Sequence, residues 1–135
     1  MEYQEFLNRT QQASKALQAG RLKEAEEQFY QLFLSSISDL DKAVICSRLA
    51  ETYDRMGRTD DAFSWYDKGI DLEQMYSRYE VTEKKAAYLA LMGRNKDATT
   101  LYETLIKQPF ITEAERERMR KIIQTLIGQS MRQWQ

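Results

Sequence analysis

Histidine is absent from this 135-residue chain, and cysteine and proline occur once each, as Cys46 and Pro109. Without histidine the chain lacks the commonest general base and the commonest zinc ligand, which excludes histidine-dependent triads and zinc hydrolases. A single cysteine cannot form an internal disulfide, and a chain of this length can bury enough apolar surface to fold without one. We therefore expect a non-enzymatic protein with no catalytic residues, no metal and no other cofactor.

The sequence also lacks an excess of charge of either sign and any long apolar run. Lys and Arg number 20 against 21 Asp and Glu, which gives a formal net charge of -1. Interleaved charges of this kind offer no basic footprint for nucleic acid. No run approaches the roughly 18 apolar residues of a membrane span, and the first residues lack the pattern of a signal peptide. We expect a cytoplasmic protein that binds neither nucleic acid nor membrane.

Glycine is scarce as well, but three of the five glycines are evenly spaced, at Gly20, Gly57 and Gly93. So few glycines and one proline predict an almost entirely helical chain. Alignment on these glycines shows an internal repeat of 36 to 37 residues. The matching columns are an alanine seven before (Ala13, Ala50, Ala86), an arginine one after (Arg21, Arg58, Arg94), an acid four after (Glu24, Asp61, Asp97), an alanine five after (Ala25, Ala62, Ala98) and an aromatic nine after (Phe29, Tyr66, Tyr102).

Each column has a physical reason if one helix ends at the glycine and a second begins just after it. Glycine adopts the left-handed conformation of a helix end without steric cost. Thr59 and Asn95 stand where the second helix needs an N-cap, and the acids two residues later favour its positive end. The recurring arginines are interpreted as partners of the exposed carbonyls at the helix end. Paired alanines let the two helices approach closely, so the repeat encodes packing.

The run Leu49, Ala50, Tyr53, Gly57, Ala62, Tyr66 resembles the tetratricopeptide repeat, a helical hairpin of about 34 residues. The first and third units are more divergent. The resemblance covers residues 6–110 and implies an all-α, right-handed solenoid of about seven helices. We expect a single domain over 1–135, with units at about 2–37, 38–75 and 76–110 and a capping helix at 112–134.

The capping helix is predicted from Thr112 and Glu115, which are spaced as a capping box directly after Pro109. Apolar residues then recur at helical spacing, as Met119, Ile122, Ile123, Leu126, Ile127, Met131 and Trp134. We expect this stripe to be buried on the last repeat, because terminal units of stacked arrays need a cover. The alternative is that Trp134 contacts a partner.

By resemblance, partners bind on a concave groove lined by the first helix of each unit. The residues this implies are Leu7, Thr10, Ser14 and Leu17 in the first unit, Ser47, Arg48, Glu51, Asp54 and Arg55 in the second, and Glu83, Lys84, Ala87 and Leu91 in the third. Only Lys84 matches the clamp with which family members hold acidic chaperone tails. A groove of mixed charge better suits an amphipathic helix or an extended peptide.

The sequence thus predicts an adaptor or chaperone-like module that binds a peptide or helix of another protein. The alternative is a structural protein that self-assembles into a homo-oligomer through its end faces, by Tyr3, Phe6 and Leu7 or by the stripe near Trp134. Cys46, among apolar neighbours, is predicted to be a buried core thiol without reactivity.

Overall fold

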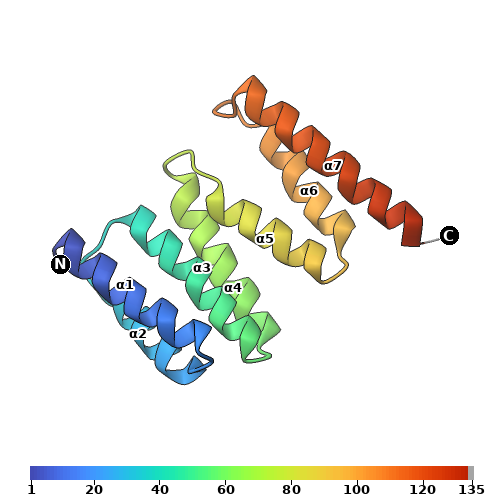
Figure 1. Cartoon of the computed structure of the whole chain (residues 1–135). Coiled ribbons are helices and arrows are strands. Elements are labelled where there is room, and N and C mark those ends of the chain that lie inside the picture. Colours follow the sequence, from blue (N-terminus) through green and yellow to red (C-terminus); the bar gives the residue numbers. More distant parts are fainter. Residues whose placement is uncertain (134–135) are drawn as a thin grey trace. The chain divides into compact units, whose positions relative to one another are not determined.

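In the computed structural model, which describes residues 1–133, the backbone forms seven α-helices and no strand (Figure 1). The all-α class is therefore confirmed. The helices are α1 (Tyr3–Gln18), α2 (Leu22–Leu34), α3 (Asp39–Arg55), α4 (Thr59–Gln74), α5 (Glu80–Leu91), α6 (Asn95–Ile106) and α7 (Glu113–Gln133). Neighbours in sequence pack as in a helical repeat: α1 with α2, α2 with α3, α3 with α4, and α6 with α7. The chain divides into two compact units, Met1–Val81 and the part that begins at Thr82.

In the first unit, the alanine and aromatic columns of the repeat form the contacts between helices. Ala13, Ala25, Ala50 and Ala62 have no exposed surface, and Phe29 is equally buried. Alanine at these positions lets paired helices lie close together, and the aromatic ring fills the wider space beside them. The core of α1, α2 and α3 consists of Phe6, Ala13, Ala16, Leu17, Ala25, Phe29, Leu32, Ile45 and Leu49. The packing role assigned to these columns is confirmed.

The three repeat glycines end α1, α3 and α5 in the left-handed conformation, as predicted. Their φ angles are 80°, 78° and 80° in chain order. At Gly57, the glycine N–H donates to the carbonyl of Asp54 at 2.9 Å, and the N–H of Arg58 donates to the carbonyl of Tyr53 at 2.9 Å. This pair of bonds is the Schellman motif, which satisfies carbonyls at a helix end. The same pairs recur around Gly20 and Gly93.

The predicted N-caps are wrong. Thr59 and Asn95 are the first residues inside α4 and α6, and the caps are Arg58 and Arg94. Arg21 holds the same place before α2, and none of the three forms a side-chain cap hydrogen bond. The reason is that the Schellman turn closes one residue after the glycine, so the next helix starts immediately.

The recurring arginine and acid columns are partners of each other. Arg21 Nε donates to Glu24 Oε2 at 2.7 Å, Arg58 Nε to Asp61 Oδ2 at 2.7 Å, and Arg94 Nε to Asp97 Oδ2 at 2.8 Å. At Arg21 and Arg58 the interpretation that the side chain serves the exposed carbonyls is wrong, because each side chain binds an acid and the backbone N–H donates to the carbonyl at the helix end. Each bridge holds an acid in the first turn of a helix, where negative charge is favourable.

A fourth turn of the same kind, at the end of α4, contains no glycine. Ser77 has a φ of 58°, and its N–H donates to the carbonyl of Gln74 at 3.1 Å while the N–H of Arg78 donates to Glu73 at 3.1 Å. The buried Glu73 side chain then accepts from the N–H of Val81 at 2.8 Å, at the start of α5. A non-glycine residue in this region is strained, so this turn stores a local cost that the glycine turns avoid.

The last helix of the compact unit that begins at Thr82 is α7, which packs against α6. The predicted capping box is confirmed: the Thr112 N–H donates to Glu115 Oε1 at 2.9 Å, and the Glu115 N–H donates to Thr112 Oγ1 at 3.2 Å. The stripe is only partly covered. Met119 and Leu126 are buried, but Ile127 and Met131 are 46% and 63% exposed, so the expectation that the whole stripe is buried is wrong. Trp134 lies outside the described residues.

We expect Ser77→Gly to stabilise the protein by about 0.5–1 kcal/mol, because glycine removes the strain of a positive φ. The matched variant, Gly57→Ser, should lower stability by about 1 kcal/mol. A Cβ at Gly57 meets no atom within 4 Å, so its cost is that of the backbone alone. Urea unfolding monitored by circular dichroism measures both changes. Two changes of the same sign would contradict the backbone explanation.

Candidate functional site

The charged residues predicted on α3 are engaged with one another and with α1. Arg48 Nη1 lies 3.4 Å from Glu51 Oε2, and Arg55 Nη2 lies 3.8 Å from Glu51 Oε1. Arg55 Nη1 also donates to the carbonyl of Leu17 at 2.9 Å, at the end of α1. Arg55 thus serves as a side-chain partner for a helix end, which is a structural role. Asp54, beside them, is exposed.

Several predicted contact residues of the compact unit Met1–Val81 are buried. Leu17 and Ser47 are 2% and 3% exposed, and the Ser47 hydroxyl donates to the carbonyl of Val44 at 2.7 Å. The prediction that these two side chains face a partner is therefore wrong. Phe6, predicted at an end face, is in the core at 5% exposure, so that prediction is wrong too. Among the remaining predicted residues, Tyr3 and Leu7 are exposed and Thr10 and Ser14 are half-buried.

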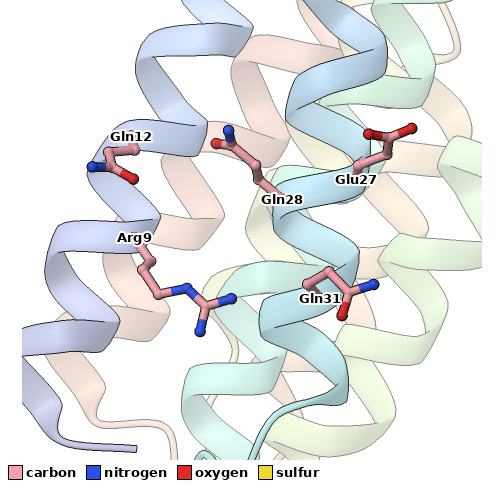
Figure 2. A pocket seen from close by; sticks show the side chains of 5 residues that line it. All are labelled: Arg9, Gln12, Glu27, Gln28 and Gln31. Carbon is pink, nitrogen blue, oxygen red and sulfur yellow. The ribbon is translucent and has the colours of Figure 1, made fainter.

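A shallow polar hollow of about 220 Å³ lies between α1 and α2 (Figure 2). Its lining is Arg9, Gln12, Glu27, Gln28 and Gln31, and Figure 2 shows the Arg9 and Gln28 side chains extending from the two helices into the space between them, Arg9 at the level of Gln31 and Gln28 at the level of Gln12. Charged and amide groups of this kind are readily hydrated and provide little apolar driving force for association. This face of the first unit therefore suits contact with water, as the outer face of a terminal repeat must.

The second unit has a larger hollow, of about 750 Å³, between α5 and α7. Ala87, Ala90 and Leu91 form one wall, and Lys121, Ile122, Thr125, Leu126 and Gln129 form the other. Leu91 is 87% exposed, although its side chain is large and apolar. The structure thus brings together two of the predicted groove residues, Ala87 and Leu91, with an α7 wall that the sequence reasoning missed.

Glu83, another predicted groove residue, is held at the end of this region by residues from two other helices. Arg118 of α7 forms two hydrogen bonds with it, Nη2 to Oε1 at 2.6 Å and Nη1 to Oε2 at 3.1 Å. The Tyr102 hydroxyl of α6 donates to Glu83 Oε2 at 3.0 Å. Burial, together with the Glu83 charge, raises the pKa of Tyr102, so the phenol stays protonated and donates this bond. We call these three residues the Glu83 network; it joins α5, α6 and α7.

The single thiol of the chain lies in the core of the first helices. Cys46 is buried, and burial raises the pKa of its thiol to about 12, so the reactive thiolate is suppressed. Within residues 1–133, no group of three His, Cys, Asp or Glu side chains is placed to hold a metal ion. In the same part of the chain, no helix combines the length and the apolar character that crossing a bilayer requires. No protein-family model, curated protein or solved structure matches the chain.

We expect the Glu83–Arg118 pair to contribute a coupling energy of about 1 kcal/mol in a double-mutant cycle of Glu83→Gln and Arg118→Gln. Its two-bond geometry and its partial burial are the reason. The Arg120–Glu113 pair on the surface of α7, at 3.0 Å but more exposed, is the matched control and should give about 0.3 kcal/mol. Urea unfolding provides all the free energies. Equal coupling in the two pairs would contradict a special role for the Glu83 network.

Proposed function

We propose that this protein is a non-enzymatic protein–protein interaction module, an adaptor or chaperone-like member of the tetratricopeptide-repeat class, that holds a peptide or helix of another cytoplasmic protein. The observation that carries the proposal is the hollow between α5 and α7. Its lining is mostly apolar and includes three polar side chains, those of Lys121, Thr125 and Gln129. This is the usual composition of a binding site.

The exposure of Leu91 is the main argument for a partner. A leucine that leaves 87% of its surface in water gains by burial against another molecule, at about 25 cal/mol for each Å² removed from water. It is accompanied by Met92, which is 43% exposed, at the same end of α5. Clustered exposed apolar side chains beside a recess are characteristic of interaction surfaces. The proposed contact surface therefore includes Ala87, Leu91 and the facing side of α7, with Lys84 next to them.

A selection of peptides from a displayed random library on the purified protein tests this proposal. We expect selected peptides to lose at least tenfold in affinity for Leu91→Asp. Leu34→Asp is the matched control, because Leu34 is also the exposed last residue of its helix, α2, so both changes place a carboxylate at a helix end. Fluorescence anisotropy measures the affinities. Peptides that bind both variants as tightly as the wild type would refute the hollow as the binding site.

Self-association is a second candidate because part of the α7 stripe is exposed. Ile123, Ile127 and Met131 follow one another at four-residue spacing along α7, and the last two are more than two-fifths exposed. A second copy that packs against this row would bury it. Sedimentation velocity over a hundredfold range of concentration tests the idea. A dimer that Ile127→Glu converts to a monomer would support it, and a concentration-independent monomer would exclude it.

A further inference from the structure

We propose that the occupant of the hollow between α5 and α7 is an amphipathic α-helix that carries acidic residues beside its apolar stripe. This inference rests on the proposed function and specifies its partner. Two properties of the hollow lead to it, namely the few hydrogen-bonding groups in its walls and the sign of the charge around it.

The walls offer an extended peptide almost nothing with which to pair its backbone. Both walls are α-helices, whose N–H and C=O groups are used within the helices. Of the polar side chains in the lining, Thr125 already donates to the carbonyl of Lys121 at 3.1 Å, and Gln129 Oε1 lies 3.5 Å from Asn95 Nδ2. An extended segment pressed on Ala87 and Ala90 would leave peptide groups unpaired, at about 1–3 kcal/mol each. A helix satisfies its own backbone and avoids this cost.

The sizes of the side chains that line the hollow also suit a helical partner. Ala87 and Ala90, in the α5 wall, are small, so the axis of a third helix can come close to this wall. Leu91, Ile122 and Leu126 then present larger apolar groups around this recess. An incoming helix with large apolar side chains at positions three and four apart would place them between these groups. The volume of about 750 Å³ leaves room for a row of such side chains.

The charge in the lining of the hollow selects for acid in the partner. Lys121 of α7 is exposed and is the charged side chain among the residues that line the hollow. Glu83 on α5 is already bound by Arg118 and Tyr102, so its charge is compensated. Along α7, Glu113 and Glu117 share Arg120 at 3.0 Å and 3.6 Å, and Glu113 also lies 3.8 Å from Arg116. A helix bearing lysines would be repelled by Lys121, whereas one bearing glutamates would be attracted.

Three fluorescein-labelled synthetic peptides test the inference by anisotropy with the full chain. All share one leucine stripe at helical spacing: one has glutamates beside the stripe, one has lysines there, and one is the glutamate peptide with a central proline. We expect the intact glutamate peptide to bind at least tenfold more tightly than the other two. Its affinity should fall at least tenfold with Leu91→Asp and with Lys121→Glu, and it should weaken as salt is raised.

The controls are Leu34→Asp and Lys15→Glu, which make the same chemical changes at exposed positions of the first unit. Thermal melts followed by circular dichroism show that each variant is folded. Equal binding of the proline peptide would overturn the helical occupant, and equal binding of the lysine peptide would overturn the acidic one. If no peptide binds, the inference fails. The proposed function then still stands where library selection yields ligands that depend on Leu91, and it falls with the inference where selection yields none.

Discussion

The rest of the fold depends on the reversal of the chain at a glycine with φ near 80°. The turn is closed by two backbone hydrogen bonds, so its length does not vary between Gly20, Gly57 and Gly93. A turn of constant length fixes which residues of the two flanking helices face each other. That is why a buried alanine seven residues before the glycine and another five residues after it recur in each hairpin. If the turn were longer by one residue, the following helix would rotate by about 100° and these faces would no longer meet.

Sequence reasoning predicted most of the fold because this constraint leaves a visible spacing. The glycines, the alanines and the capping box of Thr112 and Glu115 all have local causes that the sequence shows directly. The arginine and acid columns were seen but not paired, although their spacing of three residues at a helix start is that of neighbours on one helix face. Ser77 gave no signal, because serine in the left-handed region has no distinctive pattern around it.

The candidate site was less predictable because its two walls, on α5 and on α7, are exposed to solvent for different reasons. Counting from the glycine placed Ala87 and Leu91 correctly on an open face of α5. The same counting failed at Ser47 because α3 is enclosed on several sides, with Ala43, Cys46 and Thr52 also buried. The α7 wall was missed for another reason. An apolar stripe predicts burial, yet the stripe on α7 is wider than one neighbouring helix can cover, so Ile127 and Met131 remain in water.

If the hollow binds a partner as proposed, the Glu83 network serves both the structure of this unit and recognition. Arg118 and Tyr102 hold Glu83 from α7 and α6, so they fix the distance between the walls of the hollow. The same bonds compensate the charge of Glu83, which would otherwise oppose an acidic partner. Loss of Arg118 would therefore have two effects, a looser hollow and an exposed negative charge, and both would weaken the binding of an acidic helix. A change at Lys121 alters the charge of the hollow without touching the network, and for this reason it isolates recognition from stability.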